Sequence, residues 1–421
     1  MNQIPLSSLP PPRRRPAKAP LPLAGVRVVD FSHFLSGPYC TQILADFGAE
    51  VWKIEKPNGG DDFRSHRPPD LGGESLGYLW TNRNKKGLAL DLYSDAGRVL
   101  ALDLIDRADV LVENFSSGVM QRLGLDYETV SRRNPRLIYC SISAAGREGE
   151  LAQRVGFDPI AQAESGLMAL NGHPGDDPVV VGSPIIDITT GMMAANAVQA
   201  ALLARHNDGL GQLVEVAMLD QAAQMAGYRP MTYLVTGQEP QRVGNSSPVV
   251  VAIGMFGTAT GPIYLCCANE RSYQRLVRDA LKRPDLAEGE YAEPRQRARH
   301  RDALRQALQE TIAAQPREHW LRVMRAAGVP VGAVRTAGEA LTCDDVRERG
   351  LISAIPHPTA VQVPNLAPPY RLSRTPVADP RAAPTLGQHT GEVLRQVLGL
   401  GDDAIQSLID QGVLGVHEGH A

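Results

Sequence analysis

The chain has 421 residues, more than one hydrophobic core usually holds, so we expect two domains or one domain with a large insertion. Its 43 Lys and Arg side chains nearly balance 46 Asp and Glu side chains, giving a formal net charge of −3. This balance disfavours a nucleic-acid partner, which a general positive field would attract. The sequence contains no run of 18 apolar residues, so we expect no membrane-spanning helix.

Residues 1–22 contain seven prolines and the basic run Arg13–Arg15, with no acidic residue before Asp30. Proline disfavours the amphipathic helix that an organelle-targeting segment needs, so this composition predicts a disordered tail, with targeting as the alternative. The five cysteines form neither an even set nor a C-x-x-C pair. That pattern favours a reducing, cytoplasmic location over a disulfide-bonded protein.

The first predicted unit after the tail is β-α-β. Residues 26–31 predict a buried strand, 39–47 a helix that ends at a glycine, and 49–55 a second strand. Glu55 closes the second strand where a dinucleotide-binding fold places its ribose ligand. The glycine fingerprint is absent from the turn SHFLSGP, however, so we expect neither a nicotinamide nor a flavin cofactor.

The middle of the chain continues this alternation of strands and helices. We expect a helix at 96–107, strands at 110–113 and 137–141, a long helix from residue 189 and a strand at 212–218. The alternation predicts a parallel sheet covered by helices. The segment 240–335 is turn-rich and then strongly charged, which indicates a separate unit. From residue 356 to 384 the chain is proline-rich and predicts an extended crossing segment before a helix at 392–398.

Common catalytic motifs are missing. We find no H-E-x-x-H, G-x-S-x-G or P-loop and no clustered metal ligands, so no metal site is expected. His33 and His173 are interpreted as surface residues or satisfied polar groups. The carboxylate Asp187, in GSPIIDITTGMM, directly precedes a helix-forming run and suits an N-cap. The free N–H groups of a helix terminus would also keep this carboxylate ionised and able to attack a carbonyl, so cap and nucleophile both remain open.

Several motifs together resemble those of the class III CoA transferases, the CaiB/BaiF or formyl-CoA transferase group. They are GVRVVDFSHFLSGPYCTQILADFGAEVWKIEKPNGGD, NRNKKGLALDL, ADVLVENFSSGVMQRLGL, GFDPIAQAESGLMALNG, the Asp187 segment and PTLGQHTGEVL. The resemblance runs from about residue 23 to 416. It implies an open, Rossmann-like parallel-sheet α/β domain built from both chain ends (23–225 and 336–421), with a smaller α+β domain inserted at 226–335. It also implies an intertwined homodimer of interlocked rings.

The resemblance further implies an activity and a set of site residues. CoA moves from an acyl-CoA donor to a carboxylic acid through covalent intermediates on Asp187, which Asp158 supports. CoA is a substrate here, and its contacts are expected at Leu35, Ser36, Lys56, Leu90, Asn114, Phe115, Arg122 and Arg154. Motif similarity favours succinyl-CoA with a dicarboxylate, whose distal carboxylate would pair with Arg64, Arg67 or Arg83.

Two alternatives remain. A racemase branch of the same family uses a histidine at the position of Phe157, and phenylalanine cannot exchange a proton, so this sequence disfavours racemisation. The second alternative is a CoA-binding protein without catalysis. Some relatives cover the intermediate with a run of glycines, but this chain has NSSPVVVAIG there, so we expect a lid that is differently built or missing.

Overall fold

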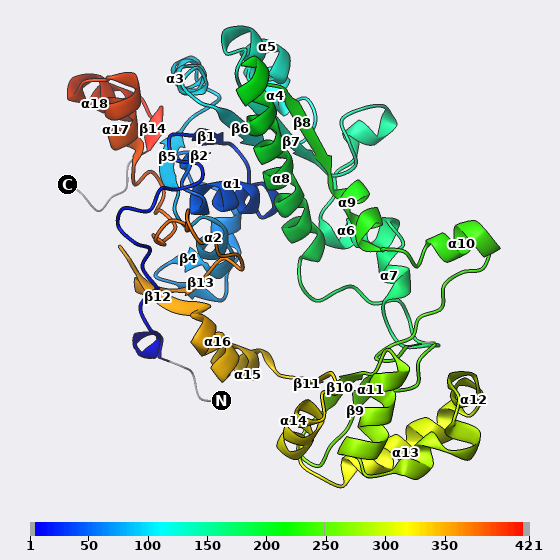
Figure 1. The fold of residues 1–421 in the computed structure, drawn as a ribbon. Coiled ribbons are helices and arrows are strands. Elements are labelled where there is room, and N and C mark those ends of the chain that lie inside the picture. The colour runs from blue at the N-terminus through cyan, green and yellow to red at the C-terminus, as the bar shows by residue number, and fades with distance from the viewer. Residues whose placement is uncertain (1–4, 248, 416–421) are drawn as a thin grey trace. The chain divides into compact units, whose positions relative to one another are not determined.

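The computed structural model describes residues 5–247 and 249–415 of the chain, which form two compact units. The predicted tail residues 1–4 and the end of the chain from 416 lie outside the described residues. The first unit comprises residues up to 167, 181–227 and 344 onward, and the second comprises 168–180 and 228–343. The fold is therefore mixed α/β, with a first unit that draws on both ends of the chain (Figure 1).

The first unit is built on a seven-stranded sheet of order β14-β5-β2-β1-β6-β7-β8. Strands β5 through β8 run parallel, and β14 pairs antiparallel with β5 at the edge. The strands are β1 (Arg27–Asp30), β2 (Glu50–Glu55), β5 (Lys86–Leu90), β6 (Val110–Glu113), β7 (Ile138–Ser143), β8 (Leu213–Ala217) and β14 (Leu414–Gly415). Strand order reverses between β1 and β6, which is the place where open α/β sheets bind ligands.

Helices cover both faces of this sheet (Figure 1). The helices of the first unit are α1 (Ser36–Asp46), α2 (Leu76–Thr81), α3 (Asp95–Ile105), α4 (Val119–Leu123), α5 (Tyr127–Arg133), α6 (Asp158–Glu164), α8 (Ile185–Asp208), α9 (Met218–Met225), α16 (Asp344–Arg349), α17 (Thr390–Val393) and α18 (Asp402–Asp410). The strands and helices expected between residues 26 and 141 are confirmed to within a few residues, because their apolar alternation is regular.

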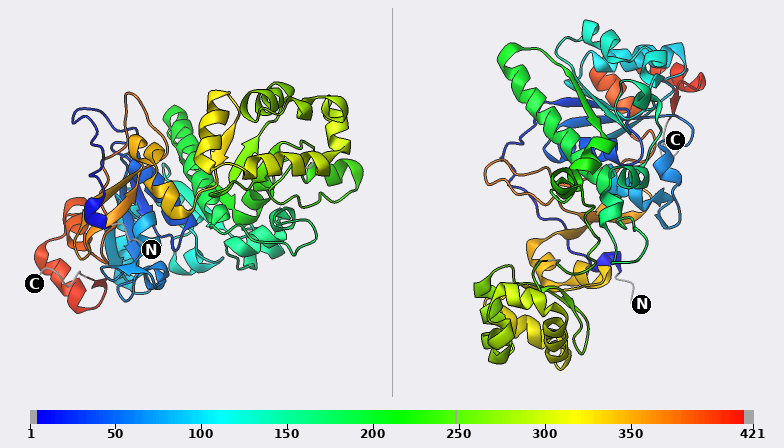
Figure 2. Two further views of the ribbon diagram at one scale, coloured as in Figure 1. Left: turned by 90° about the horizontal axis from the view of Figure 1, so that it is seen from below. Right: turned by 90° about the vertical axis from the view of Figure 1, so that its right-hand side faces the viewer.

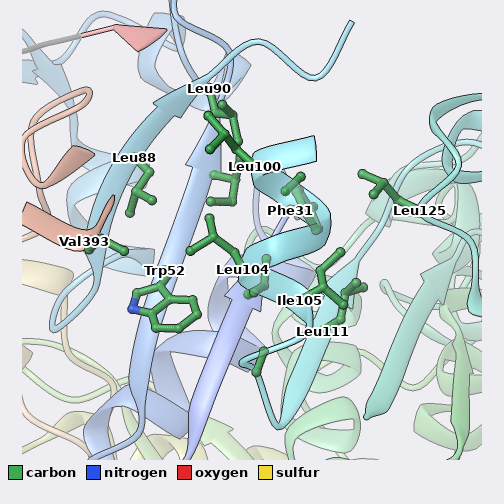
Figure 3. Close-up of a cluster of buried hydrophobic side chains, with 14 of the residues drawn as sticks. Phe31, Trp52, Leu88, Leu90, Leu100, Leu104, Ile105, Leu111, Leu125 and Val393 are labelled. Carbon is green, nitrogen blue, oxygen red and sulfur yellow. The ribbon is translucent and has the colours of Figure 1, made fainter. Parts of the chain in front are cut away.

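One face of the sheet packs an apolar core against α3. Phe31, Trp52 and Leu88 of the strands meet Leu104 and Ile105 of the helix, and Figure 3 shows these side chains interdigitating. The opposite face packs against α1 and α8, with a second apolar cluster that includes residues of β1, β2, β6 and β7. Side chains alternate between the faces along each strand, so neighbouring residues serve different cores.

Helix α8 is the long helix in the described part of the chain that is apolar enough, by length and composition, to cross a membrane. Its buried residues are small on the side that meets α1, and they include Gly191, Ala194 and Ala195. A Cβ atom at Gly191 would lie 2.6 Å from the carbonyl oxygen of Ser36. The backbones of α8 and α1 are therefore in direct contact, so that one face of α8 packs against the core of the first unit while Met192, Met193 and Leu203 are exposed.

The N-terminal segment makes specific contacts with the C-terminal part of the chain. The N–H of Ala354 donates to the carbonyl of Pro10 at 3.0 Å, and the N–H of Arg15 donates to the Asp379 carboxylate at 2.9 Å. Ala354 belongs to the hairpin β12 (Ile352–His357) and β13 (Val361–Leu366), along which the segment runs (Figure 2). From residue 5 onward this arrangement differs from the expected disordered tail. Proline-rich chain loses little backbone entropy when it docks in an extended form.

The second unit has its own antiparallel sheet and apolar core. The sheet comprises β9 (Ile253–Phe256), β10 (Ile263–Cys266) and β11 (Val331–Ala333). The helices are α10 (Met231–Thr236), α11 (Glu270–Gln274), α12 (Pro294–Arg299), α13 (Arg301–Ala313), α14 (Arg317–Ala326) and α15 (Ala337–Thr342). The unit is larger than the expected insertion because residues 168–180 join it, held in part by the N–H of Gly244, which donates to the Gly172 carbonyl.

Candidate active site

A cavity of about 840 Å³ opens at the carboxyl ends of the parallel strands of the first unit. Its walls come from the loops that follow β1, β2, β5, β6 and β7, together with the starts of α6, α8 and α9. Those loops flank the point where strand order reverses, and the volume is typical of a site for a cofactor-sized ligand.

The cavity brings together eight of the nine site residues expected from the sequence. These are Leu35, Ser36, Lys56, Leu90, Asn114, Phe115, Arg154 and Asp187. Asp158 also lines it. Arg122 does not, because it lies on the exposed side of the short helix α4. The expected CoA contact at Arg122 is therefore not supported by its position in this chain.

Asp187 does not cap α8, contrary to the N-cap interpretation. The helix begins at Ile185, so Asp187 lies inside its first turn. The Asp158 carboxylate takes the capping role, since its Oδ2 accepts the N–H groups of Ile186 at 2.6 Å and of Asp187 at 3.0 Å. The capping side chain comes from α6, 29 residues away along the chain, and no local sequence signal announces it.

This arrangement reverses the expected effect of the helix terminus on Asp187. Burial and the negative charge of Asp158 raise the pKa of Asp187 to about 7, against a lowering by a hydrogen bond with the Ser36 hydroxyl. The expectation that free N–H groups keep this carboxylate ionised is wrong, because Asp158 occupies them. Asp187 thus exchanges its proton near neutral pH in the ligand-free protein.

Four aromatic side chains form one wall of the cavity, which we call the aromatic wall: Phe34, Phe63, His66 and Phe157. Phe34 is central, with ring centroids 6.0 Å from Phe63, 5.6 Å from His66 and 5.9 Å from Phe157. Its backbone is left-handed, with φ at 59°, which a bulky residue rarely adopts. The sequence analysis missed this wall because its members are spread over 124 positions with no common motif.

The cations at the cavity are all engaged by carboxylates of the chain. Lys56 lies 2.6 Å from Asp62, with both side chains about half exposed, and Arg154 pairs with Glu164. Arg147, which the sequence analysis did not single out, lines the cavity and pairs with the buried Glu113 at 2.9 Å. An anionic ligand here must compete with or share these partners.

The three arginines expected to bind a distal carboxylate lie outside the cavity wall. Arg64 is buried and bonded to Glu55, Glu74 and the Tyr78 hydroxyl. Arg83 is buried against Asp46, 2.6 Å away, and Arg67 donates to the Gly73 carbonyl. Arg64 and Arg83 therefore have structural roles, and Arg67 is exposed. Binding of a distal carboxylate by any of the three stays a prediction.

His33 lines the cavity and stacks on Phe115, with ring centroids 4.9 Å apart. Burial and the charge of Lys53 lower its pKa, so the ring is neutral at pH 7. Within the described residues its Nδ1 atom has no hydrogen-bond partner, so the interpretation of a satisfied polar group is wrong for that atom. His173 is exposed in the second unit. Across residues 5–247 and 249–415, no three His, Cys, Asp or Glu side chains gather where they could hold a metal ion.

Several proteins that are similar to this chain in sequence are named as CoA transferases. The profile of CoA-transferase family III matches residues 23–390. The chain is 34% identical over 400 residues to human (Homo sapiens) succinyl-CoA:glutarate CoA-transferase, covering 95% of this chain and 91% of that protein. It is 37% identical over 339 residues to acetyl-CoA:oxalate CoA-transferase of Acetobacter aceti, covering 80% and 87%. A crystal structure of a CaiB/BaiF family protein from Brucella suis superimposes with a TM-score of 0.81 at 32% identity, covering 90% of this chain and 100% of that one.

The chain therefore belongs to CoA-transferase family III. The predicted family is confirmed, and so is the predicted enzyme class, a transferase that moves CoA between an acyl-CoA and a carboxylic acid. The mixed α/β fold with a large, mainly parallel sheet is confirmed as well.

Proposed function

We propose that Asp187 is the nucleophile and carries CoA as a covalent aspartyl thioester. The observation that supports this role most directly is its position in the cavity. Asp158 accepts the N–H groups of Ile186 and Asp187 at the helix end, and Asp187 lines the cavity beside Ser36. Within the described residues it forms no ion pair, so its oxygens remain available to a substrate carbonyl.

The reaction balances in four acyl transfers. A carboxylate oxygen of Asp187 attacks the thioester carbon of the donor, and CoA leaves as a thiolate, giving a mixed anhydride. The thiolate then attacks the Asp187 carbonyl, and the donor acid departs as a carboxylate, leaving the aspartyl-CoA thioester. The acceptor carboxylate attacks this thioester and releases the thiolate. The thiolate finally attacks the acyl carbon of the acceptor and regenerates the Asp187 carboxylate.

The protonation state of the Asp187 carboxylate determines what fraction of the enzyme can react. Only the ionised carboxylate attacks, and its pKa of about 7 leaves a substantial fraction protonated in the ligand-free protein at neutral pH. Its elevated pKa also makes it a stronger nucleophile than an exposed aspartate once it is ionised. The Ser36 hydroxyl, which hydrogen-bonds with the carboxylate, favours that ionised form.

CoA is proposed to lie along the strand ends that line the cavity. Leu35 and Ser36 contribute from the start of α1, Leu90 from the end of β5, and Asn114 with Phe115 from the loop after β6. Lys56 and Arg154 would hold phosphates, exchanging their present partners Asp62 and Glu164 for the ligand. Both are surface pairs, which are weak enough to exchange.

A dicarboxylate acceptor is the substrate class that relatives support, since the two proteins compared above are named for glutarate and oxalate. The cations that border the cavity in this chain are Lys56, Arg147 and Arg154. One of these, rather than Arg64, Arg67 or Arg83, would meet a distal carboxylate.

An intertwined homodimer and a cytoplasmic location complete the proposal. The second unit exposes a row of large apolar side chains on and beside α10: Tyr228, Met231, Tyr233, Leu234 and Val235. Contiguous apolar patches of this kind mark protein–protein contacts. Light scattering coupled to size-exclusion chromatography should give twice the chain mass of 45.4 kDa, and a monomer would contradict the dimer.

Covalent trapping tests the nucleophile. Enzyme incubated with succinyl-CoA and then with hydroxylamine or borohydride should yield a modified peptide that contains Asp187. Asp187→Asn should leave the peptide unmodified and reduce turnover by about 10⁴-fold or more, as loss of a nucleophile does elsewhere. An unmodified Asp187 peptide under turnover, or an active variant, contradicts the proposal. Deuterium wash-in at the α-carbon without CoA transfer would instead support the racemase, although exposed Phe157 stands where that chemistry needs a base.

A further inference from the structure

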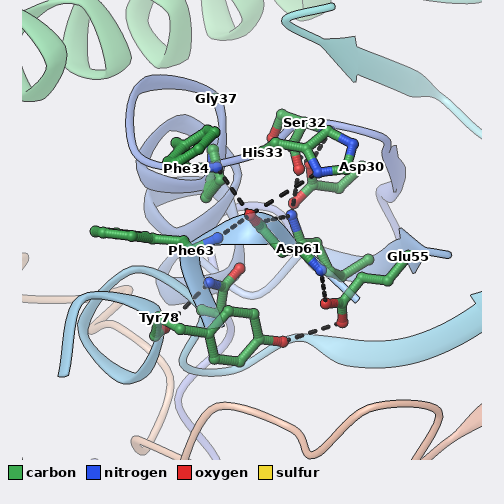
Figure 4. A network of polar contacts seen from close by, with 12 residues as sticks. Asp30, Ser32, His33, Phe34, Gly37, Glu55, Asp61, Phe63 and Tyr78 are labelled. Carbon is green, nitrogen blue, oxygen red and sulfur yellow. Dashed lines mark hydrogen bonds and ion pairs between the residues drawn. The ribbon is translucent and has the colours of Figure 1, made fainter. Parts of the chain in front are cut away.

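The loop that follows β1 is held in part by Asp61, a fully buried carboxylate, while Asn114 holds the backbone of the preceding His33. The Oδ1 atom of Asp61 accepts the N–H of Phe34 at 3.0 Å and the N–H of Phe63 at 2.9 Å. Its Oδ2 atom accepts the ammonium group of Lys53 at 2.9 Å. Figure 4 shows Asp61 between the two phenylalanine backbones, so a single oxygen joins two segments of the cavity wall.

Asp61 is itself held in place from two sides. Lys53, on β2, also donates to the carbonyl of Ser32, and the N–H of Asp61 donates to Glu55 Oε1 at 2.9 Å. Gly60 precedes it with a left-handed backbone, and a Cβ there would lie 2.8 Å from the same Glu55 oxygen. The carboxylate therefore has one available position, determined by the strand beneath it.

The segment that Asp61 holds leads directly to the nucleophile. Phe34 is kept in its left-handed conformation, which costs free energy and persists only where its surroundings enforce it. Leu35 follows, and Ser36 opens α1 and lines the cavity together with Asp187, whose pKa its hydroxyl lowers. The two N–H groups on Asp61 also set Phe34 and Phe63 against each other in the aromatic wall.

We propose that Asp61 is a positioning residue for CoA transfer, which holds the Phe34–Ser36 segment so that the Ser36 hydroxyl meets Asp187 and the aromatic wall keeps its shape. This inference rests on the proposed role of Asp187. Asp61 acts through the backbone and touches neither substrate nor the reacting atoms.

A test must separate the titration of Asp61 from the titration of Asp187, and the charged groups around each carboxylate allow this. Asp61 faces Lys53 and Glu55 on β2 and His33 after β1, whose Nδ1 lies 3.8 Å away. Burial opposes ionisation of Asp61, but the charge of Lys53 and the hydrogen bond from the N–H of Phe63 outweigh it and lower the pKa of Asp61 to about 2, so Asp61 stays charged wherever the enzyme works. Asp187 faces Asp158 and Ser36. A shift in the acidic limb of activity therefore reports on Asp187 and not on Asp61.

The experiment is the pH dependence of kcat/KM for succinyl-CoA with glutarate in Asp61→Asn, Asp61→Glu, Ser36→Ala and the double variant Asp61→Asn/Ser36→Ala. If Asp61 holds Ser36, Asp61→Asn should raise the apparent pKa of the acidic limb by about half to one pH unit, and Ser36→Ala should do the same. Each variant removes one hydrogen bond from ionised Asp187. The double variant should shift no further than Ser36→Ala alone. KM for succinyl-CoA should also rise in both Asp61 variants.

Asp46→Asn is the matched control. Asp46 is a buried carboxylate at the other end of α1, paired with Arg83, and it does not line the cavity. Its variant should melt at a lower temperature with the acidic limb unchanged. Asp61→Glu keeps the charge beside Lys53, so it decides the question if Asp61→Asn does not fold.

Three results would overturn the inference. The first is an acidic limb that keeps its apparent pKa in Asp61→Asn or Asp61→Glu. The second is a double variant whose shift equals the sum of the two single shifts. The third is failure of both Asp61→Asn and Asp61→Glu to fold, which would mean that Asp61 has a purely structural role. Activity retained in Asp187→Asn would instead contradict the proposed function. Failure of the positioning role and failure of the proposed function are thus distinguishable.

Discussion

The two faces of strands β1 and β2 bury side chains of different kinds. On the α3 face, Phe31, Trp52 and Ile54 are buried in a cluster of apolar side chains. On the other face the same strands bury Asp30, Lys53 and Glu55, each at most 1% exposed. These residues alternate along the chain, so the two environments are separated only by the thickness of the sheet.

The difference between the apolar and the charged face shows how one sheet can both stabilise the fold and position the side chains of a site. Apolar burial stabilises the fold at about 25 cal/mol per Å². Buried charges stabilise little or nothing compared with a well-packed apolar core, but they fix their partners in defined places. The charged face lies under the start of α1 and the loop after β1, where the cavity opens. We expect substitutions on the apolar face to change stability alone and substitutions near the charged end to change the pH response.

Leu104→Ala should have the largest effect on stability. Leu104 of α3 is fully buried in the apolar cluster, and its truncation leaves a cavity, so we expect a loss of about 2–5 kcal/mol in the free energy of unfolding. Urea denaturation measures this loss. The pH dependence of kcat/KM should match that of the wild type. A shifted acidic limb would contradict the expectation that the apolar face affects stability alone.

Asp187→Asn should make the ligand-free protein more stable at alkaline pH. The pKa of about 7 in the folded protein exceeds the ordinary aspartate value of 3.8, so between these values the folded state binds more protons than the unfolded state and its stability falls as pH rises. The variant lacks this loss. We expect an advantage on the order of 2–4 kcal/mol at pH 8 that vanishes near pH 4, measured by urea denaturation at each pH. Equal stability at pH 8 would contradict the raised pKa.

Asp158→Asn should lower the pKa of Asp187. The substitution removes the negative charge that faces Asp187, while the Asn carbonyl can still accept the two N–H groups of α8. The variant also loses the hydrogen bond from Gln162, so some loss of stability is expected. The acidic limb of kcat/KM should move down by about one pH unit. A limb that stays in place would mean that burial alone raises the pKa.

Lys56→Ala should have the smallest effect. Lys56 and Asp62 form an exposed pair, in contrast to the buried Lys53, so we expect less than about 1 kcal/mol of stability from it. KM for succinyl-CoA should rise by about fivefold if Lys56 binds a phosphate, with kcat unchanged. Steady-state kinetics with Lys86→Ala, a cation outside the cavity wall, provide the control.

The sequence predicts the strands and the cavity residues well because both depend on local patterns. Apolar alternation marks β1, β2 and β6, and family motifs place Asp187, Ser36 and Asn114 at the cavity. The partners of each charge were not predictable in this way. Asp158 reaches α8 from a distant helix, and Arg64 finds Glu55 only after the chain has folded. The left-handed Phe34 had no signal, since glycine or asparagine usually marks that conformation.

Gly191 gives the site a mechanical property. Because no side chain separates α8 from α1, the helix that carries Asp187 and the helix that opens with Ser36 meet main chain to main chain. Rotamer changes at this contact cannot alter their spacing. Thermal motion should therefore carry Asp187 and Ser36 together as one rigid pair, so that conformational change falls on a bound ligand and the surrounding loops.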